Sequence, residues 1–220
     1  MSKIPIYFMP GLAAGPEIFE NLTLPNAIYD LHYLQWKKPL HSEETIANYA
    51  MRMCEDILHK NPVLVGVSFG GIMVQEMSQF ITTKKVILIS SVKNKNELPK
   101  KFQLARLTKI YKLFPSKVVA NFEDYTKFFL GKSLKKRAAR YKKYLSVRDR
   151  SYLHWSIYQT ITWKGVLKTP ENLLHIHGSE DKVFPIKNIS NCLVIEGGTH
   201  VMILRESKII SEYIHESLTF

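Results

Sequence analysis

The chain has 220 residues, of which 45% are hydrophobic and 23% charged, a composition typical of globular proteins that excludes a disordered or fibrous chain. The sequence contains no apolar run of the roughly 20 residues that a membrane-spanning helix needs. Its N-terminal segment, interrupted by Pro5 and Pro10, does not resemble a signal peptide. With two cysteines, Cys54 and Cys192, the chain lacks a disulfide framework, and we expect a cytoplasmic protein.

The formal net charge of +12 is unevenly distributed. Residues 93–150 contain 18 Lys or Arg but 4 Asp or Glu, whereas the remainder contains 13 and 15. The sequence therefore indicates a nearly neutral body that carries one basic segment.

Short apolar runs alternate with stretches of helical periodicity. In chain order the patterns predict strands at 4–9 and 27–34, a helix at 42–59 capped by Ser42, a strand at 62–67, a helix at 69–81 and a strand at 84–90. The last part predicts strands at 173–177 and 191–196 and a closing helix at 205–218. Such alternation predicts an α/β fold with a mostly parallel sheet and helices on both faces.

Residues 97–160 lack strand-like runs, and their periodicity predicts three or four basic amphipathic helices. We therefore predict a core formed by residues 1–92 and 166–220, and a basic helical lid formed by residues 93–165.

The stretch Gly66-Val67-Ser68-Phe69-Gly70 matches the pattern G-x-S-x-G. It lies between a predicted buried strand and a predicted helix, the context in which this pattern forms a strained turn that exposes the serine hydroxyl. A serine hydroxyl is a weak nucleophile that needs a base and a group to orient that base. His200, in GGTHVMI, and Asp181, in HGSEDKVFP, each follow a predicted strand, so we expect both at the same sheet edge as Ser68.

These motifs resemble those of the α/β-hydrolase superfamily. The matching stretches are PGLAAGPEIF (10–19), GVSFGG (66–71), HGSEDKVFP (177–185) and GGTHVMI (197–203), and they stand in the family's order. The resemblance implies that Ser68 is the nucleophile, Asp181 the acid and His200 the base, with the backbone N–H groups of Leu12 and Phe69 as the oxyanion hole. Many relatives have His-Gly where this chain has Pro10-Gly11. The chain starts at what resembles the family's third strand, so we expect about six strands rather than eight.

Other residues offer alternatives to these assignments. Glu180, next to Asp181, could supply the acid, whereas Asp30 comes too early in the chain order. His175 and His177 share one face of a predicted strand and could bind a metal, but no Cys, Asp or Glu cluster accompanies them, so we predict a packing role. We predict no metal and no organic cofactor.

The leading functional prediction is a serine hydrolase of the carboxylesterase type that cleaves a small-molecule carboxylic ester or thioester through an acyl-enzyme. Alternatives on the same fold are a triad-dependent lyase of the menaquinone-pathway kind, a carbon–carbon hydrolase, an esterase for acyl groups carried on an acyl carrier protein, and a binding protein without catalysis. Some lid aromatics are expected to pack on the core and others to roof an apolar acyl pocket: Phe114, Phe122, Tyr125, Phe128, Phe129, Tyr152, Trp155 and Trp163.

The basic face of the lid has three interpretations. It could be a solvated surface, a docking site for an acidic partner such as acyl carrier protein, or, less favoured, a contact with anionic lipid headgroups. Nucleic acid is not expected as a partner, because no recognition motif is present.

Overall fold

The computed structural model describes residues 2–100, 102, 104 and 143–219. The basic helices predicted within 105–142, together with Phe114, Phe122, Tyr125, Phe128 and Phe129, lie outside the described residues. The strands are β1 (Ile4–Met9), β2 (Tyr29–Tyr33), β3 (Val63–Val67), β4 (Lys85–Ile89), β5 (Leu173–Gly178) and β6 (Leu193–Ile195). The α-helices are α1 (Ile46–Cys54), α2 (Phe69–Met77), α6 (Arg150–Thr162) and α7 (Ser207–Thr219), and short 3₁₀ turns are η1 (Pro16–Phe19), η4 (Ile186–Asn188) and η5 (Met202–Leu204).

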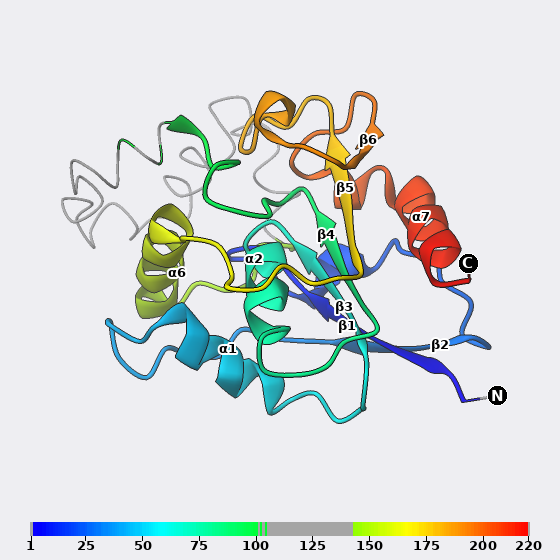
Figure 1. Ribbon diagram of the computed structural model, residues 1–220, viewed down its shortest axis with the longest axis horizontal. Coiled ribbons are helices and arrows are strands. Elements are labelled where there is room, and N and C mark those ends of the chain that lie inside the picture. The colour runs from blue at the N-terminus through cyan, green and yellow to red at the C-terminus, as the bar shows by residue number, and fades with distance from the viewer. Residues whose placement is uncertain (1, 101, 103, 105–142, 220) are drawn as a thin grey trace.

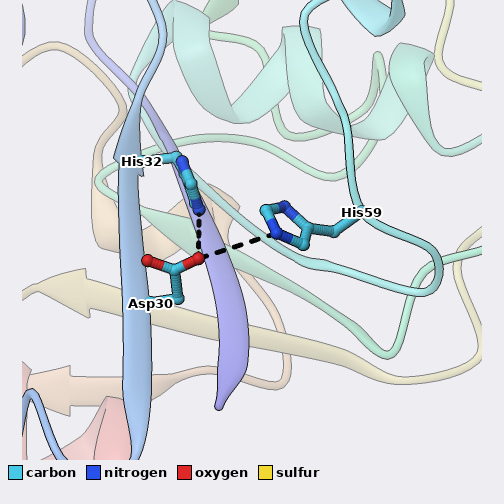
Figure 2. Close-up of side chains that lie close together, drawn as sticks. All are labelled: Asp30, His32 and His59. Carbon is cyan, nitrogen blue, oxygen red and sulfur yellow. Dashed lines mark hydrogen bonds and ion pairs between the residues drawn. The ribbon is translucent and has the colours of Figure 1, made fainter. Parts of the chain in front are cut away.

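The six strands form one sheet in the order β2-β1-β3-β4-β5-β6, and every neighbouring pair is parallel (Figure 1). The predicted six-stranded α/β fold is therefore confirmed. Strand β2 lies at one edge, where it carries the side chains of Asp30 and His32 (Figure 2). The strand order reverses between β1 and β3, and in open parallel sheets ligands bind in the crevice at the carboxyl ends of such strands.

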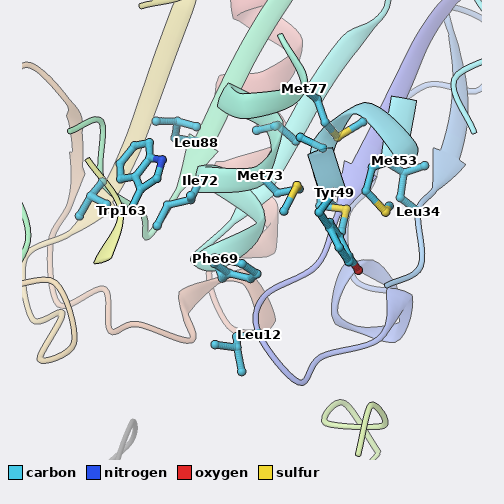
Figure 3. Packing of buried hydrophobic residues seen from close by; sticks show 14 of the residues in the cluster. Leu12, Leu34, Tyr49, Met53, Phe69, Ile72, Met73, Met77, Leu88 and Trp163 are labelled. Carbon is cyan, nitrogen blue, oxygen red and sulfur yellow. The ribbon is translucent and has the colours of Figure 1, made fainter. Parts of the chain in front are cut away.

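The two faces of the sheet are covered by different helices. Helices α1, α2 and α6 pack on one face, where Tyr49, Phe69 and Met73 belong to the same buried cluster (Figure 3). Helix α7 packs on the other face through Ile210 and Ile214. The strands β1, β3 and β4 are apolar on both faces because both are covered, as expected for a parallel sheet.

Helix α6 belongs to the segment predicted as a lid, yet Trp155 on the helix and Trp163 directly after it are buried in the core. The Nε1 atom of Trp155 donates to the backbone oxygen of Glu44 at 2.8 Å. Trp163, directly after the helix, donates from Nε1 to Oε1 of Glu76 on α2 at 2.7 Å. Tyr152 is also buried in this cluster. These aromatic side chains therefore attach α6 firmly to the core.

The predicted helix at 42–59 is shorter than expected. It begins after Thr45, not Ser42, because the Thr45 hydroxyl accepts the N–H of Asn48 at 3.2 Å. Glu44 precedes the helix and is only 2% exposed, and its carboxylate pairs with Arg52 at 2.8 Å.

The predicted helix at 69–81 is shorter as well, because it ends at Met77. Phe80, within the predicted helix, lies in the following turn and is 45% exposed. None of the helices in the described ranges combines the length and the apolar character that crossing a bilayer requires.

Candidate active site

Ser68 lies in a strained turn between β3 and α2. Its backbone angles are φ 54° and ψ −118°, a conformation that costs a non-glycine residue about 1–3 kcal/mol. Backbone hydrogen bonds hold this conformation. The Ser68 N–H donates to the backbone oxygen of Ile89 at 2.9 Å. The backbone oxygen of Ser68 accepts from the Gly71 N–H at 2.9 Å and from the Ser91 hydroxyl at 2.7 Å. The expected strand–turn–helix context of the G-x-S-x-G pattern is therefore present.

The glycines of the pattern permit close backbone packing. A Cβ atom on Gly70 would lie 2.3 Å from the oxygen of Met9 and 2.4 Å from that of Pro10. A Cβ atom on Gly66 would lie 2.3 Å from the oxygen of Gly70. The first turn of α2 thus packs directly against the end of β1, which brings Ser68 next to the loop that follows β1.

His200 comes from the loop after β6 and faces Ser68. Its Nε2 atom lies 2.9 Å from Oγ of Ser68, and its Nδ1 atom lies 2.8 Å from Oδ2 of Asp181. The carboxylate accepts the Nδ1 proton, which leaves the Nε2 lone pair free to accept from the serine hydroxyl. The ring of Phe184 packs on the imidazole with centroids 5.5 Å apart. The structure therefore brings together all three side chains singled out in the sequence.

Asp181 is 4% exposed and receives donors on both oxygens. Its Oδ1 atom accepts the N–H groups of Val183 at 2.8 Å and Phe184 at 2.9 Å, while Oδ2 accepts from His200. Burial raises the pKa of Asp181, but the charge and hydrogen bond of His200 outweigh that effect and lower it overall. Glu180 is exposed, and the hydrogen bond to His200 is made by Asp181.

His175 and His177 lie on β5, the strand that precedes Asp181, and both are buried. The Nε2 atom of His177 donates to the oxygen of Phe184 at 2.8 Å and lies 3.6 Å from Oδ2 of Asp181. His177 Nδ1 lies 3.2 Å from His175 Nε2. Burial lowers the pKa of His177 and lowers that of His175 to about 3, so both rings are neutral at neutral pH.

The loop after β1 lies against Ser68. A Cβ atom placed on Gly11 would be 3.6 Å from Cβ of Ser68, and the Gly11 oxygen accepts the Nε1 proton of Trp36 at 3.0 Å. Among the described residues, the N–H groups of Leu12 and Phe69 have no hydrogen-bond partner in the protein. Phe69 begins α2, and the first N–H groups of a helix lack partners within the helix and can bind an anion. The Leu12 N–H belongs to the turn after β1.

A mostly apolar pocket opens beside the Ser68 hydroxyl. The candidate site supplies Ser68, Phe69 and His200 to its wall, and the remaining lining is largely aliphatic. Other residues of the lining are Leu12, Ala14, Ile18, Val67, Leu145, Val183, Phe184, Val201, Ile203 and Leu204. Thr160 also lines the pocket. Its hydroxyl donates to the backbone oxygen of Ser156 at 2.7 Å, so this polar group is already paired within α6.

Some of the residues that support this arrangement were not predicted from the sequence. Ser91 was not among the predicted site residues, but its hydroxyl donates to the Ser68 backbone oxygen. Tyr144, Leu145 and Thr160 line the pocket although nothing in their local pattern indicates it. Their contribution depends on the path of the predicted lid segment back to the core, which no sequence motif records.

Comparisons with known proteins identify the fold. No protein-family model matches the sequence, and a search of curated proteins finds no match. Solved structures do match over nearly the whole chain. MenH from S. aureus has a TM-score of 0.73 at 16% identity, covering 99% of this chain and 94% of its own. A bromoperoxidase from Bacillus anthracis has a TM-score of 0.71 at 17% identity, covering 100% and 93%. The esterase EaEST from Exiguobacterium antarcticum has a TM-score of 0.70 at 18% identity, covering 100% and 93%.

This chain therefore has the α/β-hydrolase fold, as the motif resemblance implied.

Proposed function

We propose that this protein is a serine hydrolase that cleaves carboxylic esters with an apolar acyl group. The observation that carries the proposal is the continuous hydrogen-bonded series Ser68–His200–Asp181, with distances of 2.9 and 2.8 Å, at the mouth of an apolar pocket. Nucleophile, base and orienting group within hydrogen-bond reach of one another are the signature of an activated serine.

In the proposed reaction, His200 Nε2 accepts the Ser68 hydroxyl proton as Oγ attacks the ester carbonyl. The ionised Asp181 holds the imidazole in the required tautomer and stabilises the imidazolium that forms. The resulting oxyanion would accept from the free N–H groups of Leu12 and Phe69, and one such donor contributes about 10²–10³-fold to the rate in other enzymes. His200 then donates its proton to the leaving alkoxide, which departs as the alcohol.

The second half of the proposed reaction releases the acid. Water attacks the acyl-Ser68 carbonyl while His200 removes its proton, and the proton passes to Ser68 Oγ as the acyl bond breaks. The aliphatic residues Ile18, Leu145 and Ile203 would surround the acyl group. Apolar walls stabilise such a group by removing its surface from water.

The comparison structures include the esterase from Exiguobacterium antarcticum and a lipase-esterase related protein from Clostridium acetobutylicum. Their names are consistent with ester hydrolysis on this fold. Docking of acyl carrier protein or of anionic lipid stays a prediction, because the basic segment lies largely outside the described residues.

A panel of p-nitrophenyl esters with straight acyl chains of increasing length tests the proposal. We expect turnover by the wild-type protein, a preference that rises with acyl length until the pocket is full, and loss of turnover in Ser68→Ala. A second variant, Ile203→Trp, should shift the preference to shorter chains by narrowing the pocket. Absence of turnover with every ester, while a fluorophosphonate still labels Ser68, would reject ester hydrolysis and favour the lyase or carbon–carbon hydrolase alternative.

A further inference from the structure

Two histidines and an aspartate meet at the edge of the sheet near β2. Asp30 and His32 project from the same side of β2, and His59 reaches toward them from the loop between α1 and β3 (Figure 2). The Oδ2 atom of Asp30 lies 2.8 Å from Nε2 of His32 and 3.6 Å from Nε2 of His59. The three potential ligand atoms all lie within 4.8 Å of one another.

We propose that Asp30, His32 and His59 form a binding site for a divalent transition-metal ion such as Zn²⁺. Two imidazole nitrogens and one carboxylate oxygen suit Zn²⁺ and its first-row neighbours, whereas Mg²⁺ and Ca²⁺ prefer oxygen ligands alone. Three protein ligands leave a fourth position for water, and these side chains are 31–45% exposed, so an ion has a path from solvent.

The distances fit a tetrahedral ion after small movements. Ligands about 2.0–2.1 Å from a tetrahedral Zn²⁺ lie roughly 3.3 Å from one another. The separation of 3.6 Å between Asp30 and His59 is close to this value. The hydrogen bond of 2.8 Å between Asp30 and His32 would have to open, as happens when an ion takes the place of the shared proton. Because all three side chains are partly exposed, this adjustment does not disturb the packed core.

Tyr7 orients the histidines from behind. Its buried hydroxyl lies 2.7 Å from Nδ1 of His59 and accepts the N–H of Leu58 at 3.0 Å. With its proton on Nδ1, His59 donates to the Tyr7 oxygen and presents the free Nε2 lone pair toward Asp30. The Tyr7 ring also stacks on His32, with centroids 4.5 Å apart and an angle of 15° between the planes. Metal-binding histidines usually have a second hydrogen-bonded partner of this kind.

The Asp30 carboxylate supplies the negative charge of the cluster. An aspartate that is partly exposed is ionised at neutral pH and is available as a ligand. The charge of Lys3 acts on Asp30 and repels a bound ion, which limits the affinity expected of this site.

The cluster is separate from the candidate active site. His59 precedes the amino end of β3, whereas Ser68 follows the carboxyl end of the same strand. An ion bound here would link the edge strand β2 to the loop after α1 and stabilise that edge. Its binding does not depend on hydrolysis, so the proposed function and the proposed metal site can fail independently.

Isothermal titration of the metal-free full chain with Zn²⁺ tests the proposal. We expect one ion per chain at this site and a higher melting temperature with Zn²⁺ than without, because an ion that binds the folded state stabilises it. Asp30→Asn, His32→Gln and His59→Gln should each weaken zinc binding by at least about tenfold. His154→Gln, which removes an exposed histidine on α6, should leave the affinity unchanged.

Melting curves without metal establish that each variant is folded, and dialysis followed by metal analysis gives the ion count. Loss of one bound ion in His32→Gln and His59→Gln, but not in His154→Gln, would support the site. The proposal would be overturned by no measurable zinc binding, by unchanged binding in the three cluster variants, or by an equal response to Mg²⁺.

Discussion

The Nε2 atom of His200 lies 2.9 Å from the Oγ atom of Ser68, although 132 positions separate the two residues in the chain. The contact arises because β3 and β6 are parallel strands of one sheet, so the loops that follow them reach the same edge. Asp181, after β5, reaches the far nitrogen of the same imidazole at 2.8 Å. The geometry required of an activated serine thus follows from sheet topology.

The carboxylate that orients His200 can be tested by a matched pair of variants. Asp181→Asn replaces an acceptor of the Nδ1 proton with an amide, which favours the wrong tautomer, and we expect kcat to fall by about 10³–10⁴-fold. Glu180→Gln changes an exposed neighbour and should leave kcat within about twofold of wild type. Steady-state kinetics on the best ester measures both, and equal losses in the two variants would reject the assignment of Asp181.

The close packing of Gly70 on β1 predicts a loss of stability. A Cβ atom there would meet the backbone oxygens of Met9 and Pro10 at 2.3 and 2.4 Å, which cannot move as a flexible side chain does. We expect Gly70→Ala to lower the free energy of unfolding by about 1–3 kcal/mol. At Gly11 a Cβ atom would lie 3.5 Å from the oxygen of Val67 and 3.6 Å from Cβ of Ser68, which are ordinary contact distances. Gly11→Ala should therefore change the free energy of unfolding by less than about 1 kcal/mol. Urea unfolding measures the free energy of unfolding of both variants. Equal losses in Gly70→Ala and Gly11→Ala would contradict this account.

The buried His175 predicts how stability depends on pH. Burial, with smaller effects from His177 and Lys93, lowers its pKa from 6.5 to about 3. Below pH 6.5 the unfolded chain binds a proton at this position that the folded chain does not, so stability falls as the pH falls. One such group accounts for a loss of about 2 kcal/mol between about pH 6.5 and pH 5.

His175→Gln should reduce this pH dependence, measured as the slope of the unfolding free energy against pH, whatever its effect on absolute stability. Asp181 does not obscure the measurement. Its pKa is lowered from 3.8, so its contribution is present above that value and is lost only in more acidic solution. A slope identical to that of wild type would show that His175 is not the responsible group.

The sequence predicts the arrangement of the core well, because both faces of the sheet are covered and the strands appear as apolar runs. The strands around Val65 and Ile87 show this most clearly, since both lie in the middle of the sheet and are apolar apart from Lys85 at the start of β4. Helix ends were predicted less well. Thr45 rather than Ser42 caps α1, and α2 ends before Phe80, because local hydrogen bonds and burial decide the termini rather than periodicity.

The candidate site was predictable where a motif marks a local turn, as at Ser68, and where strand order places loops together, as at Asp181 and His200. The cluster of Asp30, His32 and His59 was not predicted. His59 carries no motif and lies in an irregular loop, and its contact with β2 depends on how that loop crosses the sheet edge. Ser91 was missed for the same reason, because its hydrogen bond to Ser68 exists only once β3 and β4 are paired.

The most direct test of the central claim is the rate at which a fluorophosphonate labels the protein, followed by mass spectrometry of the digested chain. An activated serine attacks the phosphorus, and fluoride leaves. We expect wild-type protein to be labelled at Ser68, and His200→Gln to react at least about 10²-fold more slowly because the base is missing. Labelling of His200→Gln at the wild-type rate, or a label on a residue other than Ser68, would contradict the claim that His200 activates Ser68.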